Sequence, residues 1–387
     1  MNIQAMKAAA NALIEEYLAD LEFFVNQDSG THDRVLVETA GGYAESLFQL
    51  AGCQVEWAHS EDLDIADSYV ARVQGSGQRR VLLLGHHDTV FGAGTAAERP
   101  YRTDGQRAYG PGVSDMKSGV VLGAYAIRLL MDASFDDFAE IVFVGNPDEE
   151  IGSPTSRQLI EREAESADLV LVLEPGRAPG AIQTTRKGVG MFELVVTGRA
   201  SHAGSQPEAG RSAVVELAHK TIALSELTNF DTGLTVNVGV VEGGTRRNVV
   251  PDSARALIDL RVASFEQSND AVIAIEEVAE RTYVEGTSST LLGGLNRPAM
   301  EKNAGTEAAL EVGWSIVREL GLEPREISSG GGSDGNFTAA LGVPTLDGLG
   351  PVGRDAHSVD EWIDLASLAD RMTLVAGLIA NAPTRSR

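Results

Sequence analysis

Cysteine is nearly absent from the 387-residue chain, which contains only Cys53. A single thiol excludes an intrachain disulfide and favours a reducing compartment, so we expect a cytoplasmic protein. The first 24 residues also lack the basic start and apolar core of a signal peptide. Instead, Leu13, Tyr17, Leu18 and Leu21 recur at helical spacing, which predicts an amphipathic helix.

Long apolar runs and excess basic charge are missing as well. No segment approaches the ~20 apolar residues that span a bilayer, so we expect no membrane insertion. The chain has 31 Lys and Arg residues against 56 Asp and Glu residues, a formal net charge of −25. Nucleic acids and anionic membrane surfaces bind through clustered Lys and Arg, so the charge argues against both partners. Solubility is the simplest interpretation of the acidic excess, and carboxylates gathered around cations are an alternative source of some of it.

The length and the apolar content indicate two domains. A chain of 387 residues is too long for one ordinary core, and 43% apolar residues suffice for sizeable cores. Helical patterns cover the N-terminus and residues 34–51, 117–131 and 154–165, and strand-like patterns cover residues 68–75, 79–85, 140–146 and 167–174. This alternation predicts an α/β domain with a doubly wound, mostly parallel sheet. The uniformly apolar strands predict that helices cover both of its faces.

The pattern changes after residue 186. Strand-like residues 190–198, 234–244, 254–262 and 288–294 are interrupted by helical residues 211–227 and 269–286. The order strand–helix–strand–strand–helix–strand predicts an inserted α+β domain of the split βαβ, ferredoxin-like type. A helix followed by a strand returns after about residue 299. We therefore expect a discontinuous domain of residues 1–186 and 299–387, and an inserted domain of residues 187–298.

Ionisable side chains follow the predicted strands of the first domain. Ligands of open α/β sheets bind beyond the carboxyl ends of the strands, so these side chains are expected at one edge of the sheet. Two loops, "YGPGVSDMKSG" and "RDAHSVDEW", add one candidate each. The candidates are His86, Asp88, Asp115, Asp148, Glu149, Glu150, Glu174 and His357.

This residue set predicts a metal site. Crowded carboxylates repel one another, and a divalent cation removes that repulsion. Histidine with Asp and Glu suits zinc, manganese or cobalt, and two histidines with three or more carboxylates exceed one tetrahedral zinc ion. Each motif alone has a simpler explanation: "DEE" is usually a solvated turn, and Glu174 a strand end. His87 alternates with His86 along its strand, so we expect it to face away and to be structural.

Eight motifs together resemble the M20 family of dinuclear metallopeptidases, and among them the carboxypeptidase G2-like glutamate carboxypeptidases. In chain order the motifs are "GHHDTV", "YGPGVSDMKSG", "NPDEEIGS", "LEPG", "RASHAG", "GGTRRNVVP", "GGGSDGNF" and "AHSVDEW". The resemblance covers nearly the whole chain. It implies that residues 187–298 form a dimerisation domain and that the protein is a homodimer.

The resemblance also implies a role for each candidate ligand. Asp115 would bridge two divalent ions, with Zn²⁺ the first choice and Mn²⁺ or Co²⁺ the alternatives. His86 and Glu174 would complete one site, and Glu150 and His357 the other. Asp88 would hydrogen-bond to His86 and fix its tautomer, and Glu149 would be the general base. The family has a cis peptide after the bridging aspartate, here Asp115–Met116.

In the inserted domain the resemblance implies contacts with substrate. His202 would reach an active site across the dimer and stabilise an oxyanion; otherwise it is a loop histidine. Asn248, Arg261 and Arg297 would bind substrate carboxylates, and Gly331 lies in a substrate-contact loop. The alternatives are a surface ion pair for Arg261, a solvated linker charge for Arg297 and a flexible turn for the glycine-rich loop.

The expected activity is metal-dependent hydrolysis of an amide bond next to a free carboxylate. Substrates would be N-acyl amino acids or peptides, with glutamate or a similar amino acid released. An aminoacylase, deacetylase or aromatic amidase on the same scaffold is the alternative. A non-catalytic binding module and a structural dimer remain as other classes, and retention of Glu149 argues against the former.

Overall fold

The computed structural model describes residues 2–385, which divide into two compact units. The first unit combines the described residues up to Thr185 with Glu301–Ser328 and the described residues from Ser333 onward. The second unit combines Arg186–Met300 with Ser329–Gly332. The sequence places the insertion at residues 187–298, and four residues of the glycine-rich loop join the second unit in addition.

The first unit is built around a six-stranded sheet with the order β1-β2-β6-β3-β7-β16. The strands are β1 (Gln54–Ala58), β2 (Ser68–Gln74), β6 (Glu140–Asn146), β3 (Arg80–His86), β7 (Leu169–Val172) and β16 (Thr345–Leu346). Strands β6, β3, β7 and β16 are parallel, whereas β2 pairs antiparallel with both β1 and β6. The prediction of a mostly parallel sheet is confirmed, and β1 is a strand that the sequence patterns did not indicate.

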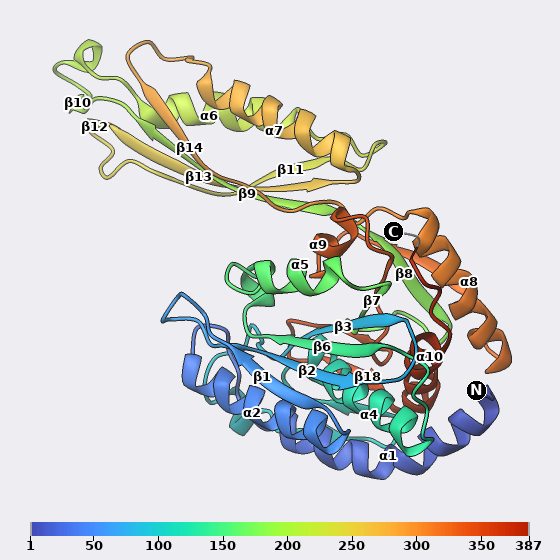
Figure 1. The fold of residues 1–387 in the computed structure, drawn as a ribbon. Helices are drawn as coiled ribbons and strands as arrows, with labels where there is room; N and C mark the ends of the chain where they lie inside the picture. Colours follow the sequence, from blue (N-terminus) through green and yellow to red (C-terminus); the bar gives the residue numbers. More distant parts are fainter. Residues whose placement is uncertain (1, 386–387) are drawn as a thin grey trace. The chain divides into compact units, whose positions relative to one another are not determined.

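Helices cover both faces of this sheet, as the apolar strands predict (Figure 1). On one face lie α1 (Ile3–Val25), α2 (Arg34–Leu50), α4 (Ser118–Asp132), α8 (Ala304–Glu319) and α10 (Leu368–Asn381), and on the other lie α5 (Arg157–Glu165) and α9 (Gly335–Ala340). Neighbouring residues of β3 pack on opposite faces of the sheet. Leu83 belongs to the hydrophobic core that includes α1 and α4, and Leu84 belongs to the core that includes α5. Successive strand side chains point to opposite faces, so both must be apolar here.

A small second sheet of the first unit joins two segments that are far apart in the sequence. Its order is β17-β18-β5-β4, from β17 (Gly353–Arg354), β18 (Trp362–Asp364), β5 (Arg107–Tyr109) and β4 (Arg102–Thr103). Trp362 pairs with Tyr109 across β18 and β5. The chain after Tyr109 therefore runs beside the segment that leads into β18. Further elements of this unit are the short helix α3 (Thr95–Glu98) and the pair β8 (Ala181–Arg186) and β15 (Arg325–Ser329).

The second unit has the predicted ferredoxin-like order. Its elements are β9 (Gly188–Thr197), α6 (Ala213–Ser225), β11 (Thr235–Gly243), β13 (Ser253–Val262), α7 (Phe265–Glu280) and β14 (Ser288–Arg297). The sheet order is β11-β13-β9-β14, with every pair antiparallel. Residues of β13 are alternately buried and exposed, since only one face packs on α6 and α7. Strand β14 is longer than the predicted residues 288–294. A separate ribbon pairs β10 (Ser201–His202) with β12 (Val249–Val250).

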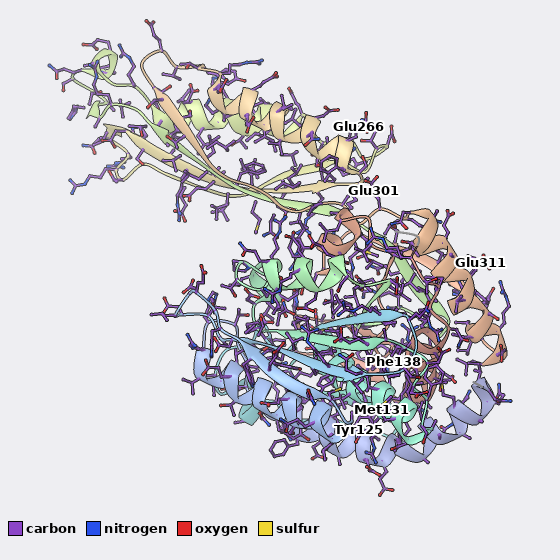
Figure 2. All side chains as sticks on the ribbon, viewed as in Figure 1. Tyr125, Met131, Phe138, Glu266, Glu301 and Glu311 are labelled. Carbon is purple, nitrogen blue, oxygen red and sulfur yellow. The ribbon has the colours of Figure 1, made fainter. Side chains whose placement is uncertain are left out.

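The charge of the chain lies largely at its surface. Figure 2 labels Glu266 on α7 and Glu311 on α8, both exposed, and Phe138, which is buried before β6. Among the helices of residues 2–385, none is both long and apolar enough to cross a lipid bilayer.

Candidate metal centre

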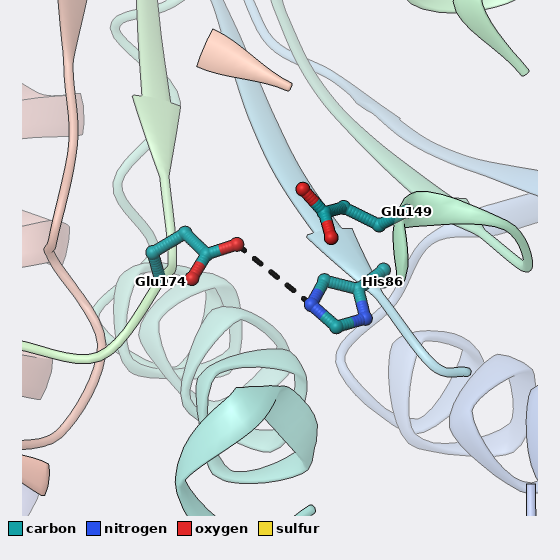
Figure 3. A group of neighbouring side chains, drawn as sticks. All are labelled: His86, Glu149 and Glu174. Carbon is teal, nitrogen blue, oxygen red and sulfur yellow. Dashed lines mark ion pairs between the residues drawn. The ribbon is translucent and has the colours of Figure 1, made fainter. Parts of the chain in front are cut away.

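Three parallel strands bring ionisable side chains to one edge of the central sheet. His86 is the last residue of β3, and Glu174 follows the end of β7 by two residues. A 3-10 turn, Glu149–Ile151, begins three residues after β6 ends. In Figure 3, Glu149 and Glu174 both extend toward the ring of His86. His86 Nε2 lies 3.7 Å from Glu174 Oε1, and the nearest ligand atoms of all three residues lie within 4.8 Å of one another.

Asp115 enters the same cluster from the loop that precedes α4. Residues Val113–Lys117 form one irregular π-type turn, and the Asp115–Met116 peptide is cis. The carboxylate of Glu361, which is 1% exposed, accepts hydrogen bonds from the N–H groups of Gly112 at 2.9 Å, Ser114 at 2.7 Å and Asp115 at 2.9 Å. Glu361 thus ties the Asp115 loop to the segment that carries His357.

The two carboxylate oxygens of Asp115 face two different histidines. Oδ1 lies 3.1 Å from His86 Nε2, and Oδ2 lies 3.2 Å from His357 Nε2. His357 Nε2 also lies 3.0 Å from Glu150 Oε2. Asp115 therefore stands between a pair formed by His86 and Glu174 and a pair formed by His357 and Glu150.

This arrangement fits two divalent cations that share Asp115. Two ligand atoms at 2.0–2.1 Å from a tetrahedral ion are about 3.3 Å apart, and the distances here scatter around that value. Glu150 Oε1 is buried and has no hydrogen-bond partner among the described residues. A buried carboxylate oxygen without a partner is costly, and a cation would satisfy it. Neutral imidazole and carboxylate are also the ligand types that zinc, manganese and cobalt accept.

The carboxylates hold both histidines as cations when no metal is bound. Hydrogen bonds to Asp115 and Glu150 raise the pKa of His357 to about 11. Burial opposes the charge on His86, but hydrogen bonds to Asp115 and Asp88 outweigh it and raise the pKa of His86 well above its usual value. Burial likewise disfavours the charge on Asp115, but hydrogen bonds with His357 and His86 hold its pKa well below its usual value. The carboxylates of this cluster therefore stabilise positive charge, whether it is carried by the histidines or by a bound cation.

Asp88 lies behind His86 and links several parts of the centre. Its backbone carbonyl and its Oδ1 lie 3.1 Å and 3.2 Å from His86 Nδ1, so the second ring nitrogen has its partners on Asp88 and Nε2 is left toward Asp115. Its Oδ2 accepts a hydrogen bond from Thr31 Oγ1 at 2.7 Å. The N–H groups of Glu149 and Glu150 donate to the same carboxylate, both at 3.3 Å. Asp88 thus orients His86 and the turn that carries both glutamates.

Two neighbours of these residues are structural. Asp148 is fully buried and accepts hydrogen bonds from Thr155 N, Thr155 Oγ1 and Ser156 Oγ, which shapes the turn after β6. His87 is fully buried beside the ring of Tyr69, as expected from the alternation along β3. Burial lowers the pKa of His87 to about 4, so its imidazole is neutral at pH 7.

The candidates of the inserted domain all lie in the second unit. His202 is exposed, and its Nδ1 accepts hydrogen bonds from the N–H groups of Gly204 and Ser205, both at 3.1 Å. The proton of the neutral ring is therefore on Nε2, which is a donor. Asn248 is exposed beside it, and its carbonyl accepts a hydrogen bond from the N–H of Ala203 at 3.0 Å.

The two arginines differ from each other. Arg261 donates to both carboxylate oxygens of Asp259, each at 2.8 Å. This is an ion pair of the kind that the sequence analysis gives as the alternative to substrate binding. Arg297 is only 4% exposed, so the alternative of a solvated linker charge is wrong. Its stem packs against Gly332, where an added Cβ would lie 2.8 Å from Arg297 Cδ. The carbonyl of Gly331 accepts a hydrogen bond from Arg186 at 3.2 Å.

Sequence reasoning missed two residues that support the Asp115 loop. Glu361 belongs to the motif "AHSVDEW", but that motif suggested a role only for His357. Lys117 is 1% exposed and donates to the carbonyls of Phe24 at 3.2 Å and Gln27 at 2.5 Å. Burial lowers the pKa of Lys117 to about 7. No local pattern marks either residue, because both have partners that are distant in the sequence.

Comparisons with known proteins identify the family of this chain. Residues 82–381 match the model of peptidase family M20/M25/M40. Carboxypeptidase G2 of Pseudomonas sp. (strain RS-16) is 32% identical over 365 residues, which cover 93% of this chain and 87% of that protein. Acetylornithine deacetylase of Myxococcus xanthus is 26% identical and covers 88% of this chain and 90% of its own.

A solved structure shows the same fold. The YXEP protein of Bacillus subtilis, described as a dinuclear metal binding peptidase from the M20 family, aligns with a TM-score of 0.70 at 16% identity. The alignment covers 96% of this chain and 98% of that one. With a family match over most of its length and a relative above 30% identity, the chain belongs to peptidase family M20 and is a hydrolase of the metallopeptidase and amidohydrolase type.

Proposed function

We propose that this enzyme hydrolyses an amide bond next to a free carboxylate and releases a C-terminal glutamate or a similar amino acid from an N-acyl or peptidyl substrate. The observation that carries the proposal is the position of Asp115, whose two oxygens face His86 and His357. Similarity to carboxypeptidase G2 supports release of a C-terminal residue. Similarity to acetylornithine deacetylase supports the second candidate, an aminoacylase, deacetylase or aromatic amidase on the same scaffold.

The proposed ligands form two sets that share Asp115. His86 and Glu174 belong to one set, and His357 and Glu150 to the other. These residues would hold two divalent ions, with Zn²⁺ preferred over Mn²⁺ or Co²⁺, and the ions would supply Lewis acidity for activating a water and polarising the amide carbonyl. Asp88 keeps His86 in the tautomer and orientation that this task requires.

Glu149 is the proposed general base. Its carboxylate lies beside His86 and Glu174, and its backbone is fixed through Asp88. It takes a proton from the attacking water as the C–O bond forms, and it gives that proton to the leaving nitrogen as the C–N bond breaks. The products are a carboxylic acid and an amine, so all atoms and charges balance.

The second unit would supply groups that contact substrate. His202 is the proposed oxyanion donor, since its Nε2 carries the proton. We propose that it acts across a homodimer, and that Asn248, Arg261, Arg297 and Gly331 bind the substrate around its carboxylates. For Arg261 this requires that a substrate carboxylate compete with Asp259.

The test uses purified protein loaded with Zn²⁺, Mn²⁺ or Co²⁺ and a panel of N-acyl amino acids and dipeptides. Glu149→Gln should lower kcat by about 10²–10⁴-fold, while the number of bound ions per chain is unchanged. Exposed Glu311→Gln is the matched control and should keep full activity. Unchanged turnover in Glu149→Gln would remove Glu149 as the base, and absence of turnover with every metal and substrate would remove the proposed function.

A further inference from the structure

A fully buried arginine without an acidic partner lies in the first unit. Arg371 belongs to α10, and none of the acidic residues that the structure describes forms an ion pair with it. Burial lowers the pKa of its guanidinium to about 10, so the group is still charged at pH 7. A buried charge without a counter-ion is costly unless polar groups compensate it. The positions of the groups that compensate it are therefore tied to the guanidinium.

Main-chain carbonyls of two chain segments supply this compensation. Arg371 donates from Nε to the carbonyl of Gly350 at 2.9 Å, and from Nη2 to the carbonyl of Gly348. Its Nη1 donates to the carbonyls of Ala181 at 2.8 Å and Pro179 at 3.3 Å. The planar fork of the guanidinium holds its donors at fixed spacing, so it sets the two segments relative to each other.

One of these segments holds the backbone of Glu174. The N–H of Gly350 donates to the carbonyl of Glu174 at 2.8 Å, and the N–H of Leu349 donates to the carbonyl of Val172 at 3.1 Å. The pairing of β7 with β16 thus continues beyond both strands as far as Glu174. A Cβ at Gly176 would lie 3.0 Å from the carbonyl oxygen of Gly350 and 3.1 Å from Nη2 of the guanidinium. The guanidinium therefore packs directly against the segment that follows Glu174.

We propose that Arg371 is a positioning residue for the metal centre, which fixes residues 348–350 and through them the carboxylate of Glu174 beside His86. The inference rests on the proposed function, which assigns Glu174 and His86 to one metal ion. Distances in a metal site are set to within about 0.2 Å, so a small displacement of Glu174 should weaken binding of that ion.

The second ligand set should depend less on Arg371. The segment of His357 is held in addition by the pairing of β17 with β18 and by the hydrogen bonds of Glu361. Loss of the guanidinium should therefore weaken the ion of His86 and Glu174 and largely spare the ion of His357.

The experiment measures binding of Zn²⁺ by equilibrium dialysis and elemental analysis, without any substrate. Arg371→Lys keeps the charge but replaces the planar fork with three donors on one nitrogen. We expect the affinity for one of the two ions to fall by about 10–100-fold. Arg79→Lys is the matched control and should keep both affinities. Arg79 also donates to a carbonyl of α10, that of Ala380 at 2.6 Å, but it precedes β3 at the end of that strand opposite His86.

Gly176→Ala tests the same contact without truncating the buried arginine. The added methyl group crowds the guanidinium and the Gly350 carbonyl, which must shift by a few tenths of an ångström. We expect a smaller loss of the same affinity, and a less than additive loss together with Arg371→Lys, because both changes act on one contact. If tryptophan fluorescence shows that Arg371→Lys does not fold, Gly176→Ala alone decides.

The outcomes separate this inference from the proposed function. Unchanged Zn²⁺ affinity in Arg371→Lys or in Gly176→Ala would overturn the positioning role, and so would equal losses in Arg371→Lys and Arg79→Lys. Equal weakening of both ions would overturn the assignment to Glu174. A parent protein that binds no Zn²⁺ would overturn the inference together with the proposed centre. Two bound ions without turnover of any substrate would overturn the proposed function alone.

Discussion

The carboxylate of Glu361 accepts the backbone N–H of Asp115 at 2.9 Å, although the two residues are 246 positions apart. The same oxygen accepts the N–H of Ser114, and the other oxygen accepts the N–H of Gly112. Both oxygens are therefore needed as acceptors. The relationship joins the loop of the proposed bridging ligand to the segment of His357, so the geometry of both half-sites depends on one buried side chain.

Glu361→Gln should weaken metal binding by about 10–100-fold. The amide NH₂ replaces one acceptor with a donor that faces backbone N–H groups, so the Asp115 loop loses part of its support. Equilibrium dialysis followed by elemental analysis measures the affinity directly. Exposed Glu311→Gln is the control, and equal affinities in the two variants would contradict the positioning role.

Asp115→Asn and His357→Ala should differ in metal stoichiometry. Asp115 faces both histidines, so its loss should reduce binding at both sites, whereas loss of His357 should spare the site of His86 and Glu174. Elemental analysis after dialysis against a fixed metal concentration should give two ions per chain for the parent protein and one for His357→Ala. His59→Ala is the control and should keep both ions, because the His59 side chain is 83% exposed and lies outside the cluster. Two ions retained by Asp115→Asn would exclude the shared bridge.

Metal affinity should rise with pH. The pKa of His357 is raised to about 11 and that of His86 is also raised, so both imidazoles are protonated at pH 7 in the metal-free protein. A metal ligand must be neutral imidazole, so binding releases about one proton from each histidine. Calorimetric titration in two buffers of different ionisation enthalpy measures this release. Binding heats that do not depend on the buffer would show that the prediction is wrong.

Acid should destabilise the second unit through Glu216. The side chains of Glu216 and Lys220 are each 1% exposed and lie 3.1 Å apart. Burial opposes ionisation of Glu216, but the N–H groups of Val284 and Tyr283 and the charge of Lys220 outweigh it and lower its pKa below 4.5. The stabilisation is therefore complete above about pH 4.5 and is lost as the pH falls through the lowered value.

Glu216→Ala should cost about 3–5 kcal/mol of unfolding free energy in this unit, because it removes the carboxylate beside buried Lys220 and the acceptor of the N–H groups of Tyr283 and Val284. Hydrogen exchange of peptides from α6 and α7 measures the loss. All three tryptophans, Trp57, Trp314 and Trp362, belong to the first unit, so their fluorescence serves as the internal control. Unchanged exchange in α6 and α7 would exclude a stabilising role for the pair.

The sequence by itself predicted most of the long helices and strands and the ionisable side chains that the structure gathers at one edge of the central sheet. Three apolar strand patterns are followed by His86, by Glu149 and Glu150, and by Glu174. Their convergence can be predicted from local patterns, because the carboxyl ends of parallel strands meet at one edge of a sheet. Side-chain alternation likewise predicts that His87 turns into the core. The ferredoxin-like order of the second unit follows from the succession of strand and helix patterns alone.

Only the tertiary structure decided which side chains support these residues and which are solvated. Glu361 and Lys117 hold the Asp115 loop through partners about 90 to 250 positions away, and no local period encodes such contacts. Burial of Arg297 also depends on neighbours that packing supplies. Local patterns fix the direction in which a side chain leaves the backbone, whereas its partner, its exposure and its pKa depend on what the folded chain places around it.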